Sequence, residues 1–195
     1  MWPWGHLAVG YLAYSIYVHA RYREPPRDPA GALFLALGTQ FPDLVDKPLG
    51  WAFGVLPSGT SLAHSLLVAP AVVALFWLLA RGFGRSTVGN AFGIGYLSHL
   101  PGDALYPIMY GRSVAIEPFL WPLVVSEPSR MPGFLSNLRY YLSRYVEFVA
   151  TPEGVGYVAF EGLLLGAAVW LWVYDGAPGT AILRGRLSRR TRSRQ

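Results

Sequence analysis

The sequence predicts an all-α integral membrane protein, a helix bundle of about five hydrophobic helices plus one amphipathic helix. Of its 195 residues, 53% are hydrophobic and only 14% are charged, whereas soluble domains average about 25% charged residues. Two segments, 62–80 and 155–174, approach the roughly 20 apolar residues that cross a bilayer core. His64 and Glu161 are the only acidic or basic side chains in these two segments, and the sequence indicates no partner for Glu161.

Proline, glycine and arginine divide the apolar runs into five candidate helices. These helices cover residues 4–20, 30–46, 62–80, 87–110 and 155–174. The first lacks the basic start and small-residue cleavage site of a signal peptide, so we expect it to remain as a helix. The fourth contains Pro101-Gly102, which we expect to kink the helix without ending it.

The long segment 111–154 contains the pattern of an amphipathic helix. Its large apolar side chains recur every three or four residues, at Leu135, Leu138, Leu142, Tyr145 and Val149. Charged side chains lie between them, at Arg139, Arg144 and Glu147. Such a helix either lies at the membrane interface or packs on the rest of the domain, and the pattern fits both.

Arginines in the loops and near the C-terminus predict the orientation. They are Arg21, Arg23, Arg27, Arg81 and Arg85 in two loops, and Arg184, Arg186, Arg189, Arg190, Arg192 and Arg194 near the end of the chain. If successive helices alternate in direction, all lie on one side, which the positive-inside rule makes cytoplasmic. We therefore expect a multi-pass protein of the cell membrane with its N-terminus outside. Residues 1–176 form the predicted membrane domain, and 177–195 form a basic cytoplasmic tail of a composition typical of disordered segments.

The composition also excludes some partners and ligands. A net charge of +5 could suit nucleic acid, but the sequence contains no recognisable nucleic-acid module, so the basic tail fits anionic membrane lipids better. The sequence contains no cysteine, which excludes disulfides and thiolate metal ligands. Any metal must therefore bind to nitrogen and oxygen.

The predicted orientation brings six polar side chains to the outer side of the membrane. They are His6, Asp43, Asp46, His64, His99 and Asp103. The two neighbouring aspartates are three residues apart and His99 and Asp103 are four apart, so each pair shares one side of a helix. Ionisable groups at membrane depth are energetically expensive, and they usually pair with one another or mark a functional path.

Imidazole and carboxylate are the ligands of catalytic zinc and related divalent metals. We expect these six residues to form a metal site, most simply for zinc, in which Asp43, Asp46 and Asp103 are also candidates for catalytic proton transfer or metal bridging. Each residue also has an ordinary alternative role. His6 can be a hydrogen-bonding residue at a helix start, and Ser61 can cap the third helix, with His64 in its first turn.

Four elements of the sequence also carry a family resemblance. They are Trp4-Gly5-His6, Phe41-Pro42-Asp43-Leu44-Val45-Asp46, Leu62-Ala63-His64-Ser65-Leu66 and Gly95-Tyr96-Leu97-Ser98-His99-Leu100-Pro101-Gly102-Asp103. In order and spacing they resemble the membrane-bound metal-dependent hydrolases, a family that includes an inner-membrane protein regulated by the LexA repressor. The resemblance covers residues 4 to about 107 and implies a metal site at the same six positions. Many members have His-Arg-Gly where this chain has Gly59-Thr60-Ser61, which weakens the case for a second metal.

Two functions follow from these observations. The first is a metal-dependent hydrolase at the outer membrane interface, acting on a lipid-linked or phosphate-ester substrate. The second is a noncatalytic membrane scaffold or transport-related protein in which the same residues form a polar cluster. A metal site requires at least three of the six side chains to point to a common centre.

Overall fold

The structure is a computed structural model that describes residues 1–109, 112–129 and 131–180. All secondary structure in these ranges is helical, which confirms the predicted all-α class. The elements are α1 (Pro3–Tyr22), α2 (Pro29–Lys47), the π-helical turn η1 (Pro48–Ala52), α3 (Ala69–Gly82), α4 (Ser86–Met109), α5 (Glu117–Leu120), α6 (Phe134–Val149) and α7 (Pro152–Tyr174). Four of the five predicted apolar helices therefore match α1, α2, α4 and α7 to within a few residues, and α4 continues through Pro101 as expected.

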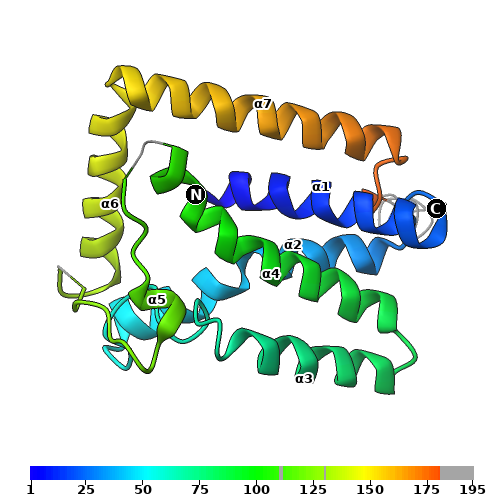
Figure 1. The fold of residues 1–195 in the computed structure, drawn as a ribbon, viewed down its shortest axis with the longest axis horizontal. Coiled ribbons are helices and arrows are strands. Elements are labelled where there is room, and N and C mark those ends of the chain that lie inside the picture. The colour runs from blue at the N-terminus through cyan, green and yellow to red at the C-terminus, as the bar shows by residue number, and fades with distance from the viewer. Residues whose placement is uncertain (110–111, 130, 181–195) are drawn as a thin grey trace, which may run out of the picture.

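Three helices, α1, α2 and α4, contact one another at the centre of the bundle. In Figure 1, α7 lies along α1 on one side and α3 lies along α4 on the other. Helix α6 runs across the end of the bundle, near the N-terminus of α1, and contacts α7 and η1. The connection 53–68 and the segments 112–129 and 131–133, which include α5, lie at this same end (Figure 1), whereas short loops join the helices at the opposite end.

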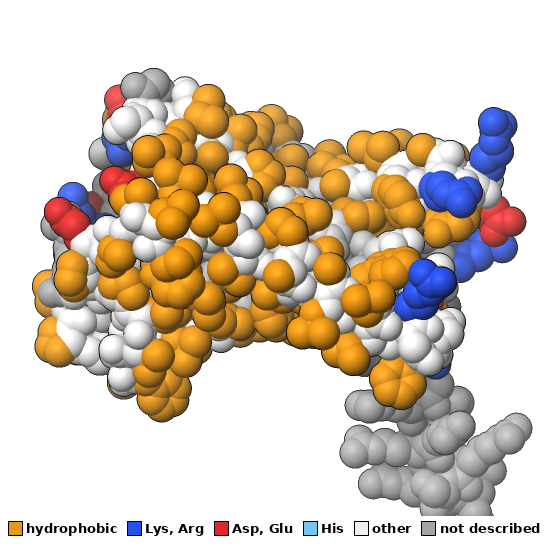
Figure 2. All heavy atoms as spheres, turned by 60° about the horizontal axis from the view of Figure 1, so that its bottom comes forward, with side chains coloured by type: hydrophobic (Ala, Val, Ile, Leu, Met, Phe, Trp, Pro, Cys, Tyr) orange, Lys and Arg blue, Asp and Glu red, His pale blue; other side chains and the backbone are white. Residues whose placement is uncertain are grey.

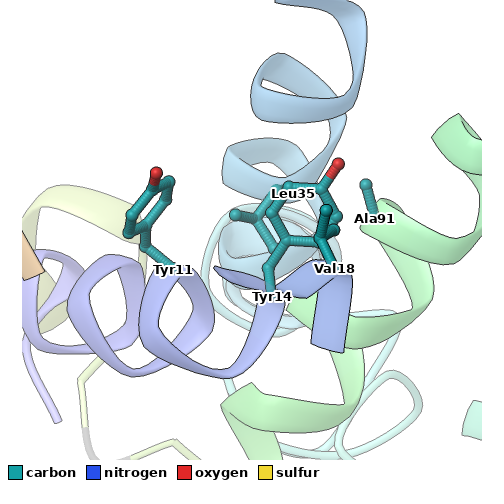
Figure 3. Close-up of a cluster of buried hydrophobic side chains, with 5 residues drawn as sticks. All are labelled: Tyr11, Tyr14, Val18, Leu35 and Ala91. Atoms are coloured by element: carbon teal, nitrogen blue, oxygen red, sulfur yellow. The ribbon is translucent and has the colours of Figure 1, made fainter. Parts of the chain in front are cut away.

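The apolar core lies where α1, α2 and α4 meet. Figure 3 shows Tyr14, Val18, Leu35 and Ala91 packed together, with Tyr11 two turns nearer the N-terminus of α1 than Val18. A second cluster joins α4 to α3 and contains Ala69, Phe92, Tyr96 and Leu100. Both clusters include α4, which makes this helix the central element of the fold.

Helices α2 and α4 approach each other closely because glycines lie at their contact. A Cβ atom on Gly38 would lie 2.3 Å from the carbonyl oxygen of Phe92, and one on Gly95 would lie 2.5 Å from that of Leu35. Small residues that bring two backbones into contact are typical of helix pairs in membranes. This close contact fixes the position of the second half of α4 relative to α2.

The predicted third helix is wrong at its start, because α3 begins at Ala69 and residues 62–68 form turns. The Asp46 carboxylate accepts hydrogen bonds from the backbone N–H groups of Ser61 (2.7 Å) and Ala63 (2.9 Å). The Tyr96 hydroxyl donates to the Ala63 carbonyl at 2.6 Å. These contacts hold the backbone of residues 61–63 against α2 and α4, and because α3 begins only at Ala69, Ser61 is not its cap.

Helix α7 is the one described helix that is both long and apolar enough to cross a membrane, judged by length and composition. Helix α3 is also apolar but has only 14 residues. Both outer helices expose large apolar side chains, such as Leu75 on α3 and Leu163 and Trp170 on α7. Figure 2 shows apolar side chains spread over one face of the molecule, with charged side chains gathered at its two ends.

The predicted amphipathic helix is α6, and it packs on the rest of the domain, which is one of the two expected arrangements. Tyr141 stacks on Trp51 of η1 with ring centroids 5.3 Å apart, and Tyr145 contacts Trp2 at 4.2 Å. Other apolar side chains of this helix, including Leu135, remain exposed. Helix α6 therefore packs on the domain through aromatic rings while it presents leucines outward. The basic segment from residue 181 onward lies outside the described residues.

Candidate metal centre

The six predicted site residues come from four separate parts of the fold. His6 lies in the first turns of α1, Asp43 and Asp46 in the last turns of α2, His64 in the connection 53–68, and His99 with Asp103 in the second half of α4. Five of them form two overlapping groups whose candidate ligand atoms lie within 4.8 Å of one another: His6, His99 and Asp103, and Asp43, His64 and His99. His99 belongs to both groups, so the two form one centre.

Three ligand atoms form a nearly regular triangle. The Nε2 atoms of His64 and His99 are 3.2 Å apart, and Asp103 Oδ2 lies 3.4 Å from the first and 3.3 Å from the second. Asp43 Oδ1 lies 3.6 Å and 4.0 Å from the same two nitrogens. Ligands bound at about 2.0–2.1 Å to a tetrahedral zinc ion are about 3.3 Å apart. The three closest atoms therefore already have the spacing that zinc requires.

The outer nitrogens of both imidazoles are occupied by acceptors. His64 Nδ1 lies 2.8 Å from Asp46 Oδ2, and His99 Nδ1 lies 2.7 Å from the carbonyl oxygen of Thr39. A carbonyl oxygen can only accept, so His99 Nδ1 carries a hydrogen and Nε2 presents a lone pair. The carboxylate selects the same tautomer at His64 when that ring is neutral. Two lone pairs 3.2 Å apart repel each other unless a proton or a metal ion lies between them.

Without metal, the surroundings of His64 favour a proton on its ring. Burial alone lowers the pKa of His64, but its hydrogen bonds to Asp103 and Asp46 outweigh burial and raise the pKa to about 9. This favours the protonated imidazole at neutral pH, so a metal ion bound at Nε2 would have to displace that proton.

Asp46 lies behind His64 and is fully buried. Besides His64 Nδ1, its two oxygens accept hydrogen bonds from the N–H groups of Ser61, Ala63 and His64 itself, at 2.7 to 3.3 Å. This geometry directs Asp46 toward the backbone and the outer nitrogen of His64, away from the triangle. Its contacts fit a carboxylate that orients a ligating histidine.

His6 stacks on His99 with ring centroids 3.8 Å apart. Its Nε2 atom is 3.1 Å from Asp103 Oδ1, which also accepts from the Met1 nitrogen at 2.8 Å. Its Nδ1 atom is buried and has no hydrogen-bond partner within the described part of the chain, whereas Nε2 faces the Asp103 carboxylate. Buried polar atoms normally have partners, so this ring is available to a ligand or a proton.

The centre is accessible from its carboxylate side. The imidazole side chains of His64 and His99 are at most 2% exposed, whereas Asp43 is 14% and Asp103 27% exposed. Lys47, which forms an ion pair with Asp43, is 32% exposed. The histidines therefore form the floor of the centre and the aspartates its opening.

Sequence reasoning missed two features near the centre. The Thr39 carbonyl orients His99, but a backbone atom leaves no signal in a residue pattern. Glu161 of α7 has partners after all: it accepts from Trp4 Nε1 at 2.8 Å and from the Tyr157 hydroxyl at 2.5 Å. This contact attaches α7 to the start of α1, two residues before His6.

His19 was not predicted to belong to the site, and it pairs instead with Asp175 at the other end of α1.

Comparison with known proteins gives a family and a location. No curated protein and no solved structure matches the chain significantly. The family model of the YdjM inner membrane protein matches residues 1–178, which include all six site residues and every described helix. Its description names a membrane and no reaction. The chain therefore belongs to the YdjM inner membrane protein family.

Proposed function

We propose that this chain binds one divalent metal ion, zinc, and acts as a membrane-bound hydrolase on a phosphate-ester or lipid-linked substrate. One observation carries the proposal: the Nε2 atoms of His64 and His99 face each other at 3.2 Å while both Nδ1 atoms are occupied. These two nitrogens and Asp103 Oδ2 lie 3.2 to 3.4 Å from one another, so a metal ion could bind all three in place of the proton that His64 carries without metal.

The residues then have separate roles. His64, His99 and Asp103 hold the metal, and Asp43 completes the donor set. A divalent metal bound there lowers the pKa of a bound water and polarises a phosphoryl oxygen. His6, whose Nε2 atom lies 3.1 Å from Asp103 Oδ1, is the candidate group for taking up a proton. Asp46 acts through His64 as a positioning residue.

Metal analysis of the purified protein tests this assignment. We expect about one zinc ion per chain after reconstitution, and loss of the metal in the variants His64→Gln and His99→Gln. His19→Gln is a matched control, because His19 hydrogen-bonds to Asp175 at the other end of the bundle. A folded wild-type protein that binds no divalent metal after reconstitution would refute the proposal.

We also propose that the apolar helices cross the inner membrane and that the metal centre faces the outer interface. Arg21 in the last turn of α1 and the loop arginines Arg23 and Arg85 are exposed at the end opposite the centre, and positive loops favour the cytoplasm. Access from the interface is the reason to expect a substrate drawn from membrane lipids.

The absence of cysteine from the sequence makes this orientation easy to measure. Single cysteines at the exposed positions Ser136 on α6 and Ser86 at the start of α4 report opposite ends of the bundle. A membrane-impermeant maleimide should label Ser136→Cys from the outer side and leave Ser86→Cys unlabelled until the membrane is opened. The reverse pattern would overturn the orientation.

A noncatalytic membrane protein is the second candidate, because part of the cluster is satisfied without metal. Asp46 has partners for both oxygens, and Asp43 pairs with Lys47. Under this function, His99→Ala changes thermal stability, and the zinc-treated wild-type protein hydrolyses no phosphate ester. Metal-dependent turnover that His99→Ala abolishes would exclude it.

A further inference from the structure

We propose that Lys47 binds the anionic phosphate group of the substrate at the opening of the metal centre. This inference rests on the proposed function, since it assigns a recognition residue to that site. Lys47 is the only lysine in the sequence. It is the last residue of α2, one helical turn after Asp43.

Lys47 is joined to the centre through a single carboxylate. Its Nζ atom donates to Asp43 Oδ2, while Asp43 Oδ1 faces His64 Nε2 at 3.6 Å. One oxygen of Asp43 therefore points to the ammonium group and the other to the metal position. The Asp43 carboxylate therefore lies between the ammonium group and the proposed metal-binding atoms.

The burial of these groups gives the direction of approach. The imidazoles lie at the floor, Asp43 is 14% exposed and Lys47 is 32% exposed. A substrate that enters from the open side meets Lys47 before it reaches the histidines. An ammonium group at such a rim attracts an anion as a point charge.

Contacts with aromatic rings restrict the Lys47 side chain. Its Nζ atom lies 5.7 Å from the ring centroid of Trp51, and Trp51 stacks on Tyr141 of α6. The cation–π contact and the stacked pair restrict a side chain that is otherwise flexible. A positioned cation loses less entropy when it binds a ligand.

Metal binding frees the lysine for the substrate. Once the charge of Asp43 is shared with a metal ion, its hold on the ammonium group weakens, because the carboxylate charge is partly neutralised. A phosphate group has several oxygens, so one can bind the metal while another accepts from Nζ. The Lys47 ammonium group then leaves the Asp43 carboxylate and binds the phosphate group of the substrate.

The ordinary interpretation is an exposed ion pair between residues four apart on a helix, which contributes only about 0.3–0.5 kcal/mol to stability. Under that interpretation Lys47 has no effect on ligand binding. The two interpretations therefore differ in a quantity that can be measured directly, the affinity of the metal-loaded protein for inorganic phosphate.

The experiment uses the full chain in detergent, loaded with zinc, and titrates it with inorganic phosphate in a calorimeter. We expect Lys47→Met to weaken phosphate binding about tenfold or more, as for loss of a charge-assisted hydrogen bond. Lys47→Arg should stay within about threefold of the wild-type protein, because the charge remains. Arg144→Met is the matched control, since it removes a cation paired with Glu147 on the exposed surface of α6.

Zinc content, measured on the same samples, separates the two proposals. If Lys47→Met keeps its zinc and binds phosphate as well as the wild-type protein, the role of Lys47 is refuted and the metal site stands. If the wild-type protein binds zinc but no phosphate, the inference is also refuted. If the wild-type protein binds no zinc, both proposals fail. Lys47→Gln repeats the comparison if the methionine variant does not fold.

Discussion

Asp46 should be the most important single residue for the stability of the connection 53–68, and Asp46→Ala tests this. The substitution removes the acceptor of the Ser61 and Ala63 N–H groups and of His64 Nδ1, all of them buried. A buried donor left without a partner costs about 1–3 kcal/mol. The three losses, at the low end of this range, predict a destabilisation of about 3–5 kcal/mol.

The assay is thermal and chemical unfolding of the metal-free protein in detergent, followed by circular dichroism. Asp28→Ala is the control, because Asp28 also accepts a backbone N–H, from Ala30 at 3.0 Å, but caps α2 at the opposite end. Loss of such a cap costs about 1 kcal/mol. If Asp46→Ala destabilises the protein no more than Asp28→Ala does, the described network does not hold the connection.

Asp46→Asn separates stability from metal binding. The amide keeps the shape and one acceptor oxygen, so we expect folded protein that still binds one zinc ion per chain, with an affinity lowered about 10- to 100-fold. Loss of zinc stoichiometry in a folded Asp46→Asn protein would instead make Asp46 a direct ligand.

Three further outcomes are expected. Zinc affinity should rise about tenfold per pH unit up to about pH 9. The reason is that His64, whose pKa is raised to about 9, must first lose its proton. An affinity that does not change over about two pH units near neutrality would contradict this. Gly95→Ala should destabilise the protein by about 1–3 kcal/mol and weaken zinc binding, because the new Cβ would meet the Leu35 carbonyl oxygen. The control Gly166→Ala should be neutral in the same unfolding and zinc assays, because the space around Gly166 is open. Glu161→Ala should lower stability by about 1–3 kcal/mol, since it removes the buried acceptor of the Trp4 indole N–H and of the Tyr157 hydroxyl. An unchanged unfolding curve would contradict a stabilising role of these contacts.

The parts of the fold that the sequence predicts are those governed by local pattern. The helices α1, α2, α4 and α7 follow from continuous apolar runs, and α6 from its spacing of three and four. The start of α3 was not predictable in this way. Residues 62–68 are as apolar as the helix that follows, and the contact that holds the start of this segment comes from a carboxylate 15 to 18 residues earlier in the chain.

The same distinction applies to the metal centre. The residues that meet at the candidate metal centre were predictable, because histidine and aspartate are rare in apolar segments and energetically expensive there. Their separate roles were not. Asp43 and Asp46 have the same chemistry and lie three residues apart, yet only the first faces the histidine Nε2 atoms, while the second faces backbone N–H groups.

The close contact of α2 and α4 explains why the centre forms where it does. Gly38 precedes Thr39 directly, and Gly95 lies one helical turn before His99, so the glycine contact brings the Thr39 carbonyl within 2.7 Å of His99 Nδ1. Asp46, two turns further along α2, orients His64 in the same way. One helix therefore sets the direction of both imidazoles, and the distance between α2 and α4 determines whether their Nε2 atoms meet. A larger side chain at either glycine would separate the helices and disturb the metal centre without altering any ligand.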